Sequence, residues 1–348
     1  MKTRKDLTIK LDTLFEKCNY LALKTPWMVV VVLHELWRSL YPADPYLKFY
    51  AEELSHSERI YNLVDKLIIM LNSVDECIYN YPFNFSVSKP FEVKEETARV
   101  YSNLWKNLSL EEKTDNTRNI IIERWKANNI NPDLVKGKSV IDVGCGSGRH
   151  SFALSKLGAN HVTAVDFGDE GLNIGRNLAE QLNINNISFR KVDVLEMPFK
   201  NESFDFVFCN GVLHHTTNIE KGIQELIRVC KKGSPIYLYL YGCGGIFWYS
   251  FNEMRKIMKQ IPLAYSQQVL DSIACPRDRW GLIDDWYVRI ATQSSDCEIR
   301  NILESLNVKK IFKLTTGRKT DLEFYANNMG EEGKTIWGEG ELRYLIHK

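Results

Sequence analysis

Residues 140–149 read VIDVGCGSGR, and this stretch decides the fold. A short β-branched run contains Asp142, and glycines follow at positions 144, 146 and 148. A glycine-rich turn between a strand and a helix permits positive φ and lets a ligand approach bare backbone. The helix expected from Arg149 to Leu157 would direct its N-terminal amides toward the same place. The stretch therefore predicts a strand–turn–helix unit that holds a nucleotide-like ligand.

Further β-rich runs follow at regular intervals, and helical segments are expected between them over residues 168–182 and 219–230. The runs cover residues 161–165, 187–192, 204–209 and 235–241. Alternation of apolar strands with helices predicts a parallel sheet covered on both faces. Asp166 ends the second run, where a carboxylate can accept hydrogen bonds from both hydroxyls of a ribose. Ligands of such sheets bind at the carboxyl ends of the strands.

Five motifs in this order resemble the class I S-adenosylmethionine-dependent methyltransferases: DVGCGSG, AVD, KVDVLEMPF, FDFVFCNGVLHH and RVCKKGSPIYLYLYG. The resemblance covers residues 91–348, with the sharpest motifs between Gly137 and Gly242. It implies a Rossmann-like, seven-stranded, mostly parallel sheet, with S-adenosyl-L-methionine as cofactor and S-adenosyl-L-homocysteine as product. Within the family, VLHHTTN and YLYG resemble the branch that acts on small molecules.

The resemblance also implies which residues hold the cofactor. Asp142, Gly144 and Gly146 would surround the methionine moiety, and Asp142 would orient its ammonium group. Asp166 would bind the ribose, with Phe167 beside the adenine. The remaining cofactor residues would be Asp193 on the adenine amino group, Val194 in the same pocket, Asn210 near the sulfonium, and Cys145 filling space beneath the cofactor.

A nicotinamide dinucleotide is the competing ligand, because the glycine turn and the acidic residue on the second strand fit it as well. The glycines, however, follow GCGSG rather than GxGxxG, and VDVLEMPF has no role in a dehydrogenase. The methyltransferase interpretation is therefore preferred.

His214 and His215 are the candidate catalytic residues, since they follow the fourth strand at the ligand-binding edge. The imidazole pKa lies near neutrality, which suits a general base. A base is needed only where the acceptor loses a proton. The alternative is that both rings bind backbone groups or line the pocket, and His215 is the preferred base of the two.

Residues 244–295 are expected to form an insertion after the fifth strand, where class I enzymes commonly build the acceptor site. Aromatic rings there could stack on a substrate or surround a cation, and a carboxylate could hold an amine. The alternative is an aromatic core for the insertion. The candidate substrate residues are Tyr241, Trp248, Asp285, Trp286 and Tyr287, together with Tyr101 and Trp105 in the segment before the first strand.

The amino-acid composition of the chain limits the classes of partner and cofactor that it can bind. Lys and Arg number 45 against 44 acidic residues, so net charge gives no attraction to nucleic acid. The eight cysteines form no CxxC pair and have no clustered histidines, so neither a metal site nor a disulfide framework is expected. WMVVVVL, at residues 27–33, is too short to span a membrane. A cytoplasmic protein with reduced thiols is the expectation.

Residues 1–90 precede the resemblance and show helical spacing at Leu7, Leu11 and Leu14 and again over residues 60–71. We expect a small, mainly helical domain or cap that shapes the acceptor pocket, forms a homodimer interface or binds a partner. At the other end, residues 309–314 and 341–346 are expected to be strands. The last should be antiparallel and beside the fifth, as in the family, with a polar connection over residues 315–340.

Two functions remain open. The first is methylation of a small metabolite at N, O, S or C, chiefly by positioning the reactants. The second is methylation of a macromolecule, tRNA or protein, with the N-terminal domain as docking module. The absence of a [DNS]PP[YFW] motif after the fourth strand, where CNGV stands, counts against amino-methylation of nucleic-acid bases.

Overall fold

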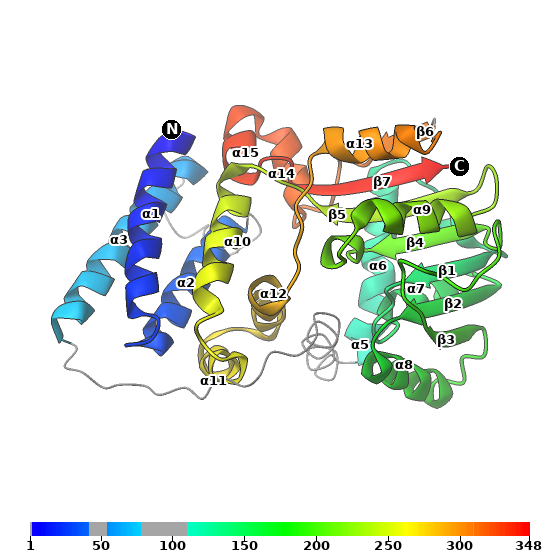
Figure 1. Ribbon diagram of the computed structural model, residues 1–348, viewed down its shortest axis with the longest axis horizontal. Coiled ribbons are helices and arrows are strands. Elements are labelled where there is room, and N and C mark those ends of the chain that lie inside the picture. The colour runs from blue at the N-terminus through cyan, green and yellow to red at the C-terminus, as the bar shows by residue number, and fades with distance from the viewer. Residues whose placement is uncertain (1, 42–53, 78–109, 309) are drawn as a thin grey trace. The chain divides into compact units, whose positions relative to one another are not determined.

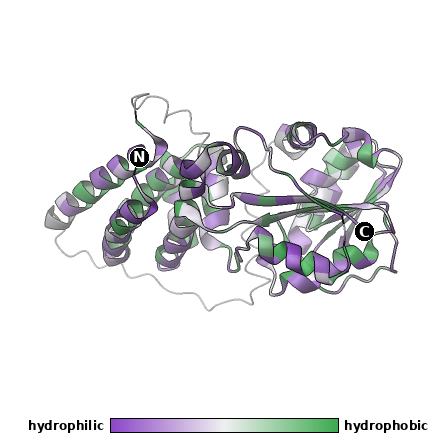
Figure 2. Ribbon diagram, turned by 90° about the horizontal axis from the view of Figure 1, so that it is seen from above, coloured by the Kyte–Doolittle hydropathy of each residue, from purple (hydrophilic) through white to green (hydrophobic). Residues whose placement is uncertain are grey.

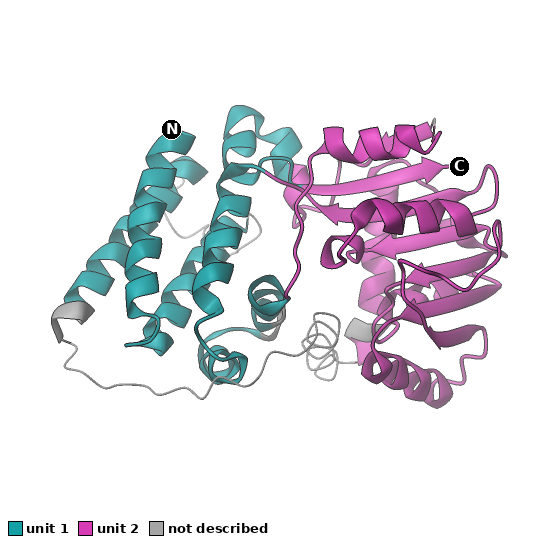
Figure 3. Cartoon of the chain, viewed as in Figure 1, with its two compact units in different colours: residues 1–90, 244–288, 325–340 teal, residues 91–243, 289–324, 341–348 magenta. Residues whose placement is uncertain are grey.

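The chain forms two compact units, each assembled from three separate segments (Figure 3). The computed structural model describes residues 2–41, 54–77, 110–308 and 310–348. Unit 1 comprises residues 1–90, 244–288 and 325–340, and unit 2 comprises residues 91–243, 289–324 and 341–348.

A seven-stranded sheet forms the centre of unit 2, in the order β3-β2-β1-β4-β5-β7-β6. Strands β1 to β5 are parallel, and β7 pairs antiparallel with both β5 and β6. The strands are β1 (Ser139–Val143), β2 (His161–Asp166), β3 (Ile187–Lys191), β4 (Phe206–Asn210), β5 (Pro235–Tyr241), β6 (Lys310–Lys313) and β7 (Glu341–His347). The predicted fold class and the antiparallel insertion of the last strand beside the fifth are confirmed.

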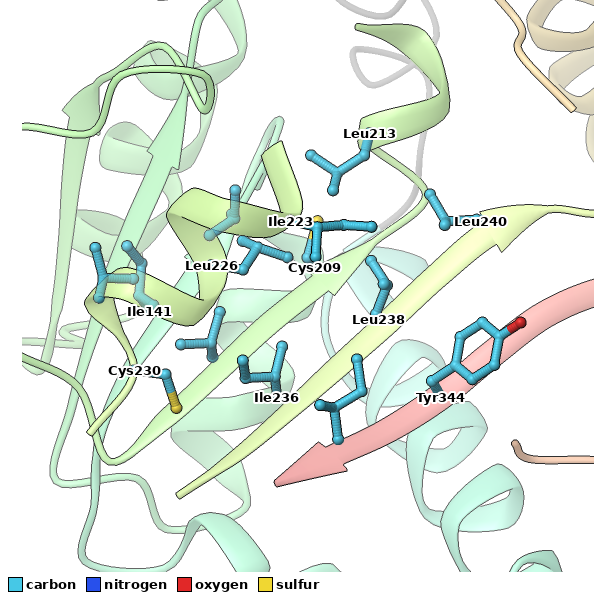
Figure 4. Close-up of a cluster of buried hydrophobic side chains, with 14 of the residues drawn as sticks. Ile141, Cys209, Leu213, Ile223, Leu226, Cys230, Ile236, Leu238, Leu240 and Tyr344 are labelled. Carbon is cyan, nitrogen blue, oxygen red and sulfur yellow. The ribbon is translucent and has the colours of Figure 1, made fainter. Parts of the chain in front are cut away.

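One face of this sheet is covered by α9 (Ile219–Val229) and α13 (Asp296–Ser305). Apolar side chains of β4, β5 and β7 meet those of α9 in a continuous core, shown in Figure 4. Ser295 and Glu298 form a capping box that begins α13. In Figure 2 the strands are largely green, as expected for a sheet that is buried on both faces.

Three helices cover the opposite face: α6 (Asp115–Ala127), α7 (Arg149–Lys156) and α8 (Asp169–Gln181). Trp125 of α6 packs edge-on against Phe206 of β4, with ring centroids 5.9 Å apart. The short elements α5 (Leu110–Lys113), η2 (Pro132–Val135) and η3 (Leu213–His215) complete the described part of unit 2, apart from the first residues of α14 (Leu322–Asn328).

The regular elements described in unit 1 are all helices (Figure 1). Its helices are α1 (Arg4–Leu21), α2 (Pro26–Leu40), α3 (His56–Cys77), α10 (Gly245–Met258), α11 (Leu263–Ile273), α12 (Pro276–Tyr287), α15 (Gly330–Trp337) and the end of α14. α10 packs against α1, α2, α12 and α15. The apolar run of residues 27–33 lies in α2, where Val29, Val30 and Val32 are completely buried.

Two expectations about domain organisation need correction. The segment expected as a polar connection, residues 315–340, contains α14 and α15, and Ile336 and Trp337 are completely buried. Residues 244–288 and 325–340 group with the N-terminal helices rather than with the sheet. The helical region at residues 1–90 is therefore only one of the three segments that form unit 1.

Candidate functional site

The loop after β1 has the backbone conformation that its glycines predict. Gly144, Gly146 and Gly148 have φ values of 70°, 56° and 85°, a region that side chains rarely tolerate. The amides of Gly144 and Cys145 donate to the Val165 carbonyl at 2.8 and 2.9 Å, which fixes the loop against β2. A Cβ on Gly144 would collide with the side chain of Val212. The φ of Gly144 and the neighbouring Val212 side chain therefore both require glycine at this position.

Asp166, at the end of β2, binds this loop. Its Oδ2 accepts from the Gly146 amide at 2.9 Å, and its Oδ1 accepts from the Gly168 amide at 2.8 Å. Burial raises the pKa of Asp166, and the hydrogen bonds from the backbone oppose this shift. The carboxylate is thus held in one orientation beside the glycine loop.

Asp142 is a buried carboxyl group on β1, 1% exposed. Ser151 of α7 donates to its Oδ2 at 2.6 Å. Burial raises the pKa of Asp142 to about 7, and the neighbouring charge of Asp166 adds to this effect while the bond from Ser151 opposes it. A cationic ligand would stabilise the ionised form of this buried carboxyl group.

The ends of β2 and β3 carry the residues expected around an adenine. The Asp193 carboxylate accepts from the Leu195 amide at 3.0 Å, and Val194 packs partly buried against the core. The Phe167 ring is 37% exposed, and the Lys191 ammonium lies 5.6 Å from its centroid. The Phe167 side chain is thus partly exposed directly after β2, on the side of the sheet where the adenine is expected.

The two histidines occupy different environments. His214 is 1% exposed, its Nδ1 accepts from the Tyr241 amide at 3.1 Å, and its ring stacks on the Tyr241 ring at 3.6 Å. Burial lowers the pKa of His214 well below its usual value. The His215 Nδ1 lies 2.6 Å from the Ile290 carbonyl, to which it can only donate, and this bond orients the ring. His214 has the contacts of a structural residue.

The residues expected at the acceptor lie in different places. Tyr241 belongs to unit 2 and is covered by His214. In unit 1, Trp248 and Trp286 are 2% and 1% exposed. The Asp285 carboxylate accepts from Trp37 Nε1 at 2.7 Å, and the Tyr287 hydroxyl donates to the Ile261 carbonyl at 3.0 Å.

These contacts favour the interpretation of Trp248, Asp285, Trp286 and Tyr287 as an aromatic core, because their side chains are enclosed by unit 1's own helices. Tyr101 and Trp105 lie outside the described residues. Contact with an acceptor stays a prediction for this group.

Sequence reasoning did not identify two parts of the site. His150, in the first turn of α7, lies beside Phe208 with ring centroids 5.3 Å apart, and burial lowers its pKa well below the usual value. Its position directly after GCGSGR could have drawn attention to it. Tyr239 and Glu341 form a polar pair at 2.6 Å on β5 and β7. No motif marks this pair, because it depends on the register of the two strands.

Within the described ranges, no cluster of His, Cys, Asp and Glu side chains is arranged to hold a metal ion. Among the helices that are described, none is long and apolar enough to cross a membrane.

Five parallel strands with an antiparallel strand inserted beside β5, and ligand-binding features gathered at their carboxyl ends, define the class I methyltransferase fold. A family model described as a methyltransferase domain matches residues 134–278. The chain therefore carries a domain of the class I S-adenosylmethionine-dependent methyltransferase family, whose cofactor is S-adenosyl-L-methionine.

Curated relatives match part of the chain. A demethylmenaquinone methyltransferase of Clavibacter sepedonicus is 36% identical over 105 residues, 30% of this chain and 41% of that protein. A ubiquinone biosynthesis O-methyltransferase of Coxiella burnetii is 33% identical over 131 residues, 35% of this chain and 55% of that protein. The chain thus spans about half the length of the curated relatives that it matches.

Among solved structures, the chain is similar to a putative S-adenosylmethionine-dependent methyltransferase of Methanococcus maripaludis. The identity is 17% and the TM-score 0.43, with 76% of this chain and 97% of the other covered. The order of the strands, rather than this overlay, defines the fold.

Proposed function

We propose that this chain transfers the methyl group of S-adenosylmethionine to a nucleophilic atom (N, O, S or C) of a small metabolite. The convergence of the glycine loop, Asp142 and Asp166 at the carboxyl ends of β1 and β2 carries the proposal. Asp193 after β3 and Asn210 at the end of β4 extend the same edge.

The described residues fit the cofactor. A carboxylate has about four lone-pair sites, so Asp166 can accept from ribose hydroxyls in addition to its two backbone donors. Asp142 is buried with a raised pKa, and the ammonium of the cofactor would supply the cation that it needs. Phe167 would stack on the adenine, Asp193 would accept from its amino group, and Val194 and Cys145 would fill the space around the cofactor.

A bound sulfonium supplies an already activated methyl group. The chain's own residues therefore contribute mainly orientation and the exclusion of water. Asn210 would form the wall near the reacting atoms, and Gly144 and Gly146 would let the cofactor lie against backbone. Where the acceptor loses a proton, His215 Nε2 is the proposed acceptor of that proton, and His214 holds the Tyr241 backbone in place.

A small acceptor is favoured over a macromolecule by two observations. Both curated relatives named above bear the names of quinone-pathway enzymes, and the 45 basic residues are balanced by 44 acidic ones. If the acceptor is tRNA, its binding and therefore the rate of methylation should fall steeply as the salt concentration rises. The rate of turnover of a small molecule should barely change. Incubation of a metabolite extract with methyl-labelled cofactor tests the proposal directly. Label should appear in small molecules, and label found only in RNA or protein would contradict the proposal.

Asp166→Ala should weaken binding of S-adenosylhomocysteine by about 10- to 100-fold, because charge-assisted hydrogen bonds to the ribose and to the Gly146 amide are lost. Isothermal calorimetry measures the change. Asp169→Ala is the matched control, since Asp169 lies on an exposed helix turn and pairs only with Lys191 in the described contacts. If both variants bound S-adenosylhomocysteine with equal affinity, Asp166 would not be a ligand of the ribose.

His215→Ala should lower turnover by about 10²- to 10⁴-fold, the usual contribution of a general base, while the affinity for S-adenosylhomocysteine stays unchanged. Turnover is followed over about pH 6 to 9, which brackets the imidazole pKa. His161→Ala is the control, because His161 begins β2 at the opposite end of the strand from Asp166. Full activity of His215→Ala across this range would exclude a base at position 215.

A further inference from the structure

A cluster of charged side chains lies in unit 2 beside β5 and β7, next to the ligand-binding edge. Arg343 of β7 pairs with Glu323, and its Nη2 lies 2.9 Å from Glu341 Oε2. The Tyr239 hydroxyl donates to Glu341 Oε1 at 2.6 Å, and the Arg343 guanidinium lies 4.3 Å from the centroid of the Tyr239 ring. These contacts join two neighbouring strands through their side chains.

The cluster continues away from this edge. Arg124 of α6 donates to both carboxylate oxygens of Asp321, each at 2.7 Å. Asp321 and Glu323 are 3% and 1% exposed. Burial raises the pKa of Glu323 to about 8 although the charge of Arg343 opposes this shift, whereas Arg343 and Arg124 together lower the pKa of Asp321 against the effect of burial. The five groups are two guanidiniums and three carboxylates, so no cation in the cluster lacks a carboxylate partner.

Tyr239 and Glu341 form the outer end of the cluster, and the register of the sheet places this end at the proposed site. Asn210 pairs with Tyr239, and Tyr239 pairs with Arg343. Adjacent strands are about 4.8 Å apart, and β5 lies two strands from β1, which the glycine loop follows. The Tyr239 backbone therefore lies about 10 Å from the line of β1. The Tyr239 ring also approaches Gly211, because a Cβ on that glycine would lie 3.2 Å from Tyr239 Cε1.

Both ends of the cluster are partly open, since the Arg124 side chain at the far end is 19% exposed. The side chains of Arg343 and Glu323 are 3% and 2% exposed, whereas that of Glu341 is 18% exposed. The Glu341 oxygens retain lone pairs beyond those used by Tyr239 and Arg343, and the Tyr239 oxygen can accept as well as donate. This end can therefore accept hydrogen bonds from a ligand, but it presents no unpaired cation to an anion.

Burying several charges costs more than packing apolar side chains of similar size, so such a cluster is retained where it serves specificity or function. We propose that Tyr239 and Glu341 form a subsite for a hydrogen-bond-donating group of the methyl acceptor, a hydroxyl or an ammonium, and that this subsite disfavours carboxylates and phosphates. The inference rests on the proposed methyl transfer. Arg343 and Glu323 are positioning residues that hold the Glu341 carboxylate in one orientation.

Three probes in NMR titrations of the protein saturated with S-adenosylhomocysteine test the subsite: catechol, 2-phenylethylamine and benzoate. We expect catechol or 2-phenylethylamine to bind at least about ten-fold more tightly than benzoate. Tyr239→Phe should weaken the preferred probe by about three- to ten-fold while it keeps the Arg343–Glu341 pair intact. Glu341→Gln should weaken it further, because a charged acceptor is lost.

Tyr237→Phe is the matched control, since Tyr237 lies two residues earlier on β5 and stacks on Phe208 with ring centroids 4.8 Å apart. Its probe affinities should equal those of the unaltered protein. The inference fails if benzoate binds best, if none of the probes binds, or if Tyr239→Phe and Tyr237→Phe behave alike. Failure of the unaltered protein to bind S-adenosylhomocysteine would instead overturn the proposed function.

A second readout separates binding of the acceptor from damage to the fold. With the acceptor found in the labelled extract, Tyr239→Phe should raise KM and leave kcat within about two-fold, as expected when binding of ground state and transition state is lost equally. A fall in kcat with an unchanged KM would contradict a binding role for Tyr239.

Discussion

Gly146→Val should abolish measurable binding of S-adenosylhomocysteine. The Gly146 amide donates to Asp166, and the residue has a φ of 56°, so a branched side chain would both strain the loop and enter the space of the ligand. The strain alone should cost about 1–3 kcal/mol of stability, which leaves most of the protein folded at room temperature. Calorimetry measures the binding, and circular dichroism confirms the fold.

Gly137→Val provides the control for backbone strain. Gly137 has a similar φ of 71°, a Cβ there would meet nothing within 4 Å, and the residue lies just before β1 rather than after it. Its variant should lose a comparable amount of stability and keep its affinity for the ligand. If both variants lost binding equally, strain rather than occupation of the ligand's space would be the cause.

Arg343→Met should destabilise unit 2 by about 3–5 kcal/mol, because the substitution leaves the buried Glu323 and the partly buried Glu341 without their shared cation. Urea denaturation followed by circular dichroism measures the change in the free energy of unfolding. Lys231→Met is the control, since Lys231 and Asp205 form a partly exposed pair at 2.7 Å whose loss should cost no more than about 1 kcal/mol.

The pH dependence of Arg343→Met has a defined sign. Burial already raises the pKa of Glu323 to about 8, and Arg343 opposes that shift. Without the guanidinium the folded-state pKa rises further above the unfolded value, so the folded variant keeps this carboxyl group protonated to a higher pH. The stability of the variant should therefore fall further than that of the unaltered protein as the pH rises above about 8. An equal stability difference between the two proteins at every pH would contradict the role assigned to the pair.

The sheet of unit 2 was predictable because its strands are short apolar runs and its loops carry glycine and aspartate at fixed places. The runs of β1, β2, β4 and β5 are buried on both faces, as in a parallel sheet enclosed by helices, whereas β3 and β6 at the edges are more exposed. The strands expected at residues 161–165 and 235–241 coincide with β2 and β5 to within one residue. The motif around Asp142 and Asp166 located the candidate cofactor site for the same reason.

The composition of unit 1 was not predictable from local patterns. α14 and α15 are short, and each contributes few apolar side chains, such as Leu322, Ala326 and Ile336, so no helical period is visible. The aromatic residues of α10 and α12 were ambiguous between substrate contact and core packing. Only the three-dimensional structure shows that Trp248 donates to the Gly340 carbonyl at 3.1 Å within the same unit.

The charged cluster escaped prediction for a different reason. Arg124, Asp321, Glu323, Glu341 and Arg343 come from segments up to about 200 residues apart, and charged residues in a sequence are normally expected on the surface. Their burial depends on which strand lies beside β5 and on the register of that pairing.

Because unit 1 is formed by three separate segments of the chain, its folding depends on the order in which these segments are synthesised. α1, α2 and α3 are synthesised before their partners α10 and α12, which follow only after β5, and α15 follows later still. The sheet also waits for β7, which inserts between β5 and β6. Unit 1 can complete its core only once α15 has been made, and unit 2 only once β7 has been made. The apolar faces of α1, α2 and α3 therefore lack part of their packing partners while the intervening sheet strands are being synthesised.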